Sequence, residues 1–282
     1  MIFIIFSITC SVIVAILLKL ARRYKINVPQ AVTFNYLFAL SLGFIFFKPA
    51  VSQLVTLYKP VYIVLGVLLP VVFWLLAGSI RRIGIVKTDI AQRLSLFIPI
   101  IAASLLFNEH FSILKITGLV TGLFAIIFIL YKTKQEQYKN SGLIFPILVF
   151  LGFGIIDVLF KKVAQIQTIP FTTSIVGIFG ISFIVSIIGI SYLIFIKKEK
   201  FQFINILCGC ILGLFNFGNI FFYLKAHQAL AEQPSTVFAT MNIGVITLGT
   251  LVGLFIFKEK LKLLNYIGLV LAIISVLLIT LY

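Results

Sequence analysis

Ten long apolar runs follow one another along the chain, and each is about as long as a lipid bilayer is thick. A helix needs about 20 apolar residues to cross the hydrocarbon core. The runs predict membrane-spanning helices at residues 2–18, 29–47, 61–80, 90–107, 111–131, 143–160, 171–196, 203–223, 237–257 and 264–282. Hydrophobic residues make up 62% of the chain and charged residues 11%, whereas soluble domains have roughly 25% charged residues. The sequence therefore predicts an all-α integral membrane protein.

The net charge of +16 has two interpretations. In a soluble protein it would suggest nucleic acid as a partner, but in a membrane protein lysines and arginines mark the cytoplasmic ends of spans. We favour the second, because no basic stripe with interleaved aromatic residues stands out. Loops after odd-numbered runs carry 17 lysines and arginines, and the other loops carry 6. The positive-inside rule then predicts a multi-pass protein of the cell membrane with both termini outside.

The chain contains an internal repeat. Five runs precede the polar linker at residues 132–142 and five follow it, and residues 107–131 align without a gap on residues 257–281. Because each half has an odd number of spans, the second half must enter the membrane upside down. The sequence therefore predicts two inverted five-helix repeats, residues 1–131 and 143–282. Inverted repeats are typical of secondary transporters.

A more specific resemblance follows from the order of these features. A lysine closes the first run of each half, Lys19 and Lys161, and each half ends in a Phe-x-Glu hairpin followed by glycine. The whole chain thus resembles the drug/metabolite transporter superfamily, in its EamA-type branch. The resemblance implies a secondary transporter, often an exporter of amino acids or other small metabolites. We expect no cofactor and no metal site. The resemblance does not identify the substrate, and we expect a monomer or a homodimer.

The hairpin glutamates, Glu109 and Glu259, have two interpretations. At the start of the last helix of its half, each carboxylate would face the positive end of the helix dipole, with Lys115 or Lys260 as a further partner. We favour this structural role over proton coupling. Small residues follow at helical spacing and predict close packing of the last helix of each half. They are Gly118, Gly122 and Ala125, and their equivalents Gly268, Ala272 and Ser275. Gly249 and Gly253 predict a similar stripe on the ninth run.

Ionisable residues inside membrane spans point to functional sites. Asp157 lies well inside the sixth run, with Lys161 one turn later. The two side chains could form an ion pair, or Asp157 could bind a cationic group or carry a proton in a central cavity. Arg93 lies in the fourth run, where it could extend to the membrane surface or bind an anionic group such as a carboxylate. For Lys19 and Lys161 we expect extension to the surface.

Neutral polar residues within the runs are further candidates for a substrate site. An amide in hydrocarbon needs a hydrogen-bond partner, which is either another helix or a solute. The candidates are Asn216 and Asn219 on one face of the eighth run, together with Gln92, Asn242 and Trp74. With Asp157 and Arg93, they form the predicted substrate-binding set.

Two other classes of protein fit the sequence less well. An enzyme is disfavoured because the chain has only two histidines, His110 and His227, and neither HExxH nor GxSxG occurs. We expect both histidines to lie at the membrane interface. A channel is disfavoured because no selectivity-filter sequence is visible and an inverted repeat suits alternating access better.

Overall fold

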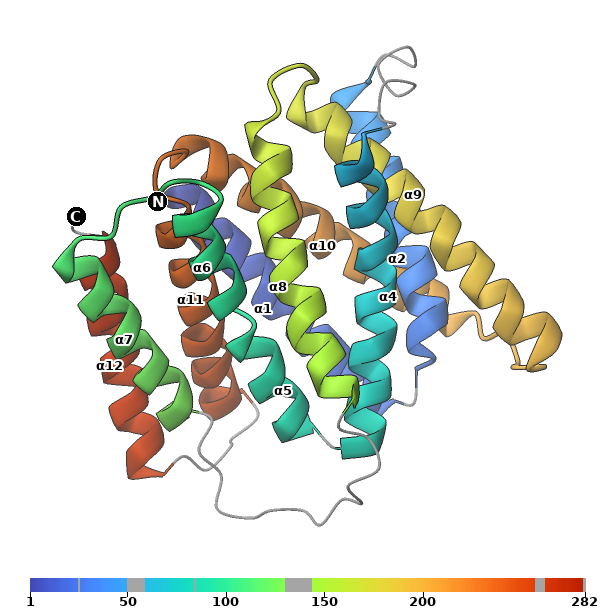
Figure 1. Cartoon of the computed structure of the whole chain (residues 1–282). Coiled ribbons are helices and arrows are strands. Elements are labelled where there is room, and N and C mark those ends of the chain that lie inside the picture. The colour runs from blue at the N-terminus through green and yellow to red at the C-terminus, as the bar shows by residue number, and fades with distance from the viewer. Residues whose placement is uncertain (25, 50–58, 84, 130–143, 257–261, 281–282) are drawn as a thin grey trace.

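All the regular structure that the described residues form is helical. The computed structural model describes residues 1–24, 26–49, 59–83, 85–129, 144–256 and 262–280. The helices pack into one bundle, and α1 begins at the same end of the bundle at which α12 ends (Figure 1). Their bounds are α1 (Ile2–Arg23), α2 (Val28–Phe47), α4 (Pro60–Ile83), α5 (Ile85–Leu94), α6 (Phe97–Leu105), α7 (Ile113–Ile129), α8 (Ile144–Gln165), α9 (Phe171–Ser191), the π-helical turn η1 (Tyr192–Ile196), α10 (Ile204–Ala229), α11 (Pro234–Phe255) and α12 (Leu263–Thr280).

The helices have the length and surface of membrane spans. Seven of the described helices are long and apolar enough to cross a bilayer, and three shorter apolar segments lie at Ile2–Leu18, Ile90–Leu105 and Ile113–Ile129. Large apolar side chains such as Phe6, Phe46 and Ile188 are exposed on the protein surface. An apolar surface this extensive is stable only in contact with lipid. The chain is a multi-pass helical membrane protein.

The fourth predicted span is not one continuous helix. It is split into α5 and α6 by a turn at Ser95 and Leu96. Pro99 explains the break, because proline lacks the N–H that would bond to the carbonyl of residue 95 and its ring clashes with that carbonyl. At the position aligned with Pro99 the second half has Gly249, and α11 runs unbroken through it.

The last helices of the two halves, α7 and α12, pack against each other. All six small residues of the two predicted stripes are buried. A Cβ atom on Gly268 would lie 2.7 Å from the backbone nitrogen of Ile129, and one on Gly118 would lie 2.8 Å from the Cγ1 atom of Ile279. The two helix axes therefore approach as closely as glycine permits. On α11 only one of the two glycines of the predicted stripe lies in a packed environment. Gly253 is buried, but a Cβ on Gly249 would meet open space.

The structure gives Glu109 a different role from the predicted one. Its helix, α7, begins only at Ile113, so the carboxylate is not in the first turn of that helix. Instead, its oxygens accept hydrogen bonds from the backbone N–H and the hydroxyl of Ser235, at 2.8 and 2.6 Å. Ser235 is in the first turn of α11, whose free N–H groups attract a carboxylate. The predicted pairing with Lys115 is present, at 2.7 Å. Glu259 lies outside the described residues.

Candidate functional site

A cavity of about 150 Å³ lies in the middle of the bundle, among α1, α4, α5, α8, α10 and α11. Six of the seven predicted substrate-binding residues line it. They are Gln92 and Arg93 from α5, Asp157 from α8, Asn216 and Asn219 from α10, and Asn242 from α11. The apolar part of the wall includes Phe73, Phe153, Phe160 and Met241. Side chains that are more than 120 residues apart in the sequence thus surround one small space with both polar and apolar walls, which we call the central cavity.

Asp157 provides the negative charge of the central cavity. It is half-buried, and its carboxyl accepts a hydrogen bond of 3.0 Å from the hydroxyl of Tyr223. The proposed ion pair with Lys161 is absent from the described structure. The Lys161 side chain is 0% exposed, and its Nζ atom donates to the carbonyl of Ala231 at 2.6 Å. The predicted extension of Lys161 to the membrane surface is therefore wrong. The side chain of Lys19 lies outside the described part of the chain. Asp157 lines the central cavity, and the side chain of Asn242 is its second hydrogen-bonding neighbour.

The asparagine side chains of the cavity differ in whether they have hydrogen-bond partners within the protein. Asn219 accepts a hydrogen bond of 2.7 Å from the hydroxyl of Ser7 on α1, and Asn242 donates to the carbonyl of Phe238 in its own helix at 3.1 Å. Asn216 is 5% exposed, and its amide nitrogen has no hydrogen-bond partner among the described residues. A buried donor without a partner costs about 1–3 kcal/mol. A polar solute in the cavity would supply that partner.

Arg93 provides the positive charge. Its side chain lines the central cavity, in the last turn of α5 before the break between α5 and α6. Ser95, in the break itself, lines the same cavity and donates a hydrogen bond of 2.6 Å to the carbonyl of Gln92. The break therefore places irregular backbone and a guanidinium group beside the cavity.

Two residues change the predicted set. Trp74 lies apart from the other six, because its indole ring packs against Gly189 of α9 and is not in the cavity wall. Tyr223 was missed, although a signal existed in the sequence. It continues the face of α10 that carries Asn216 and Asn219, seven and four residues before it, and positions at this spacing share a helix face.

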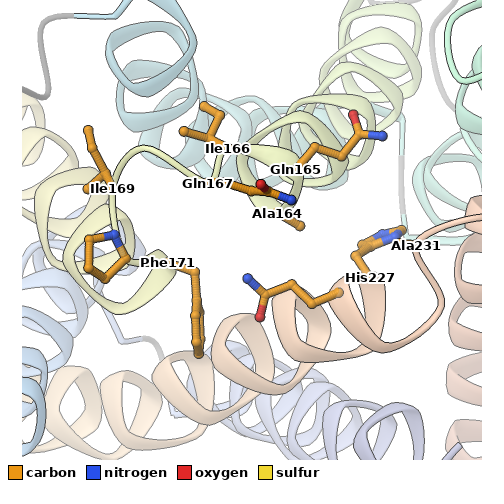
Figure 2. A pocket seen from close by; sticks show the side chains of 10 residues that line it. Ala164, Gln165, Ile166, Gln167, Ile169, Phe171, His227 and Ala231 are labelled. Atoms are coloured by element: carbon orange, nitrogen blue, oxygen red, sulfur yellow. The ribbon is translucent and has the colours of Figure 1, made fainter.

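A second cavity, of about 680 Å³, lies at the end of the bundle where α8 and α10 finish. Figure 2 shows its walls: Gln165 and Gln167 come from the end of α8 and the loop after it, and His227 and Ala231 come from the end of α10 and the turn after it. We call this cavity the vestibule. His227 does not extend into an interfacial layer as expected, since it is 1% exposed, whereas His110 is exposed.

The remaining reactive side chains form no further centre in the part of the chain that the structure describes. Cys10, Cys208 and Cys210 are free and half-buried. No three His, Cys, Asp or Glu side chains come together there in a way that would hold a metal ion.

The comparisons with known proteins extend over nearly the whole chain. No family sequence profile matches it. A crystal structure of another protein superposes with a TM-score of 0.77 at 13% sequence identity, covering 99% of this chain and 96% of the other, so the two share a fold. An uncharacterized protein of Haemophilus influenzae is 41% identical in an alignment 276 positions long that covers 94% of this chain and 93% of that protein. Identity of this extent shows common descent, and the chain belongs to the same family as the Haemophilus influenzae protein.

Proposed function

We propose that the protein is a secondary transporter that moves small zwitterionic metabolites, such as amino acids, by alternating access. The observation that carries the proposal is the central cavity. A carboxyl, a guanidinium and four amides from four helices, α5, α8, α10 and α11, line one small cavity in a membrane bundle. Charged side chains are costly within a bilayer and usually mark the path of a substrate or an ion.

The packing of the helices supports an inverted repeat. Gly118 packs on Ile279, and Gly268 packs on Ile129. Residues 118 and 268, and residues 129 and 279, are each 150 positions apart, so the two contacts are exchanged by the repeat. In the repeat, α1, α2 and α4 of the first half correspond to α8, α9 and α10 of the second. The contact of α1 with α10 therefore has its counterpart in that of α8 with α4, and the contact of α2 with α10 in that of α9 with α4. Such reciprocity is expected of two halves related by a twofold axis, as in the EamA-type drug/metabolite transporters.

The break between α5 and α6 also supports transport. Secondary transporters commonly build their substrate sites at interrupted helices near the middle of the membrane, where free backbone groups can contact the solute. Here Arg93 and Ser95 lie at or next to the interruption and line the central cavity. In the proposed mechanism this segment changes its packing when the site opens to the other side.

The charges of the central cavity indicate the substrate class. The Asp157 carboxyl would bind an ammonium group, the Arg93 guanidinium would bind a carboxylate, and the asparagines would orient both. A volume of about 150 Å³ is below the roughly 300–1,000 Å³ of sites for drug-sized ligands, so a solute of few atoms fits best. Asp157 is also the side chain placed to carry a coupling proton.

The membrane orientation and the direction of transport complete the proposal. The same end of the bundle holds the beginning of α1 and the end of α12 (Figure 1). The bias of 17 against 6 basic residues in the loops supports an orientation with that end outside a cell membrane. The family resemblance favours export toward that side.

Counterflow in proteoliposomes tests the proposal. Vesicles loaded with a high concentration of one unlabelled amino acid should transiently accumulate the labelled amino acid from outside, because a carrier exchanges solutes through one site. A set of neutral amino acids, organic cations and sugars would identify the substrate. Flux that never saturates and shows no counterflow would instead indicate a channel. The absence of flux for every solute tested would contradict the proposal that the protein is a transporter.

A further inference from the structure

The central cavity and the vestibule are consecutive along the same two helix faces. On α10, Asn216, Asn219 and Tyr223 line the central cavity or contact Asp157, and His227, one turn after Tyr223, lines the vestibule. On α8, Phe160 lines the central cavity, and Ala164 and Gln165 line the vestibule. Residues three, four and seven apart share a helix face. One continuous pair of faces therefore leads from Asp157 to the end of the bundle.

Aromatic rings separate the two spaces. The ring of Tyr223 lies against that of His227, with centroids 4.7 Å apart, and His227 in turn lies 4.8 Å from the ring of Phe238. His227 is 1% exposed, and neither of its ring nitrogens has a hydrogen-bond partner among the described residues. Burying an imidazole without hydrogen bonds is unfavourable. A small rotation of the His227 ring into the vestibule would let its nitrogens form hydrogen bonds there. The partition is thus one layer of side chains with an unsatisfied polar group beside the vestibule.

Buried charges next to the vestibule are not balanced. Glu109 is paired with Lys115, and both are buried, at 6% and 2% exposed. The fully buried Lys161 forms no salt bridge among the described residues. Glu109 attracts it electrostatically, and its Nζ atom donates to the carbonyl of Ala231, which is part of the vestibule wall. This local group therefore has one excess positive charge. Lys162 and Glu232 also lie nearby, but both are exposed, so salt screens them far more than it screens Lys161.

We propose that the vestibule is an entrance site that binds the carboxylate of a small solute, and that Tyr223 and His227 form the movable partition between this site and Asp157. The excess positive charge that Lys115 and Lys161 have over Glu109 attracts the carboxylate, and the amides of Gln165, Gln167 and Gln228 and the His227 ring supply hydrogen bonds. This inference rests on the proposed function, because it gives the solute of the central cavity a route to one face of the membrane.

Thiol chemistry tests the charge preference without measuring transport. In a background in which Cys10, Cys208 and Cys210 are serine, Gln228→Cys places a thiol in the vestibule. The full-length protein is treated with two methanethiosulfonate reagents of similar size, the anionic sulfonatoethyl and the cationic trimethylammonioethyl forms. For each reagent, the rate of reaction with the protein is divided by the rate of reaction with a small free thiol in solution, which corrects for its intrinsic reactivity. Thr168→Cys, exposed in the loop between α8 and α9 and outside the vestibule wall, is the matched control.

The expected result is a preference of at least about five-fold for the anionic reagent at Gln228→Cys that persists in 1 M salt, whereas any preference at Thr168→Cys disappears there. Adding Lys161→Met to Gln228→Cys should remove the preference, once gel filtration shows that this variant is folded. A preference equal to that of the Thr168→Cys control, or no reaction with either reagent, would overturn the entrance site. Because no flux is measured, this outcome is distinct from failure of counterflow.

The partition has its own test in the same background. Asn219→Cys places a thiol in the central cavity, beyond Tyr223 and His227. Adding His227→Ala should speed its reaction with the anionic reagent by a factor of several, because the layer then has a gap. His110→Ala, at an exposed histidine, should have no effect. Equal rates with and without His227→Ala would refute the partition.

Discussion

Glu109 holds the amino-terminal end of α11 through both polar groups of Ser235, although the two residues are 126 positions apart. The carboxylate accepts the backbone N–H at 2.8 Å and the hydroxyl at 2.6 Å, and Lys115 balances its charge at 2.7 Å. The contact joins the hairpin that ends the first half of the chain to a helix of the second half. Ser235 follows the turn at Ala231 that forms part of the vestibule wall, so the contact fixes the position of α11 beside that wall.

The first prediction is that Glu109→Gln strongly destabilises the protein. Removing the charge leaves Lys115 buried without a counter-ion, and breaking a buried ion pair on one side costs about 3–5 kcal/mol. Thermal unfolding of the purified protein in detergent should show a large fall in Tm. Glu232→Gln, at an exposed carboxylate, should change Tm little. Equal Tm values for both variants would contradict the structural role of Glu109.

The Glu109 contact also shows where sequence reasoning stopped. The position of the glutamate before a helix predicted a helix N-terminus as its partner, but local spacing suggested the nearest helix, α7, and the observed partner is α11. The helix end that lies closest to Glu109 depends on the tertiary packing, which a local sequence pattern does not predict. The central cavity could be predicted better, because a polar residue within an apolar run is costly to expose to lipid and must face inward. Trp74 did not follow this rule, since its ring is apolar enough to pack against Gly189.

The second prediction is that Asp157→Asn reduces counterflow at least about ten-fold, equivalent to about 1.4 kcal/mol. Asparagine has nearly the same shape and can still accept the hydrogen bond from Tyr223, so the bundle should keep its Tm while the site loses its negative charge. Counterflow needs no proton gradient. A variant that keeps counterflow but loses accumulation driven by a pH gradient would assign Asp157 to proton coupling, and unchanged transport in both assays would remove it from the mechanism.

The third prediction concerns the hydroxyl of Tyr223, which donates to Asp157 at 3.0 Å. Tyr223→Phe removes this bond and keeps the ring that contacts His227. Because the carboxyl then loses one of its two side-chain partners, Tyr223 and Asn242, we expect the concentration for half-maximal counterflow to rise several-fold with little loss of Tm. Tyr36→Phe is the matched control, since Tyr36 is equally buried and its hydroxyl has no hydrogen-bond partner among the described residues. It should leave transport unchanged, and an equal effect of both variants would argue against a specific role for Tyr223.

The fourth prediction separates close helix packing from helix propensity. Alanine is favoured over glycine within a helix by about 1 kcal/mol, so Gly249→Ala, whose new Cβ meets open space, should raise Tm or leave it unchanged. Gly268→Ala should lower Tm, because its Cβ would lie 2.7 Å from the backbone nitrogen of Ile129 and 3.0 Å from the carbonyl oxygen of Ala125. Backbone atoms cannot rotate aside as a side chain can, so α12 must move away from α7, and overpacking of this kind costs about 1–3 kcal/mol. Opposite signs for the two substitutions in one thermal-unfolding series would support the α7–α12 contact as a fixed seam. A rise in Tm for both would mean that the two helices can separate without loss, as parts that move during transport would.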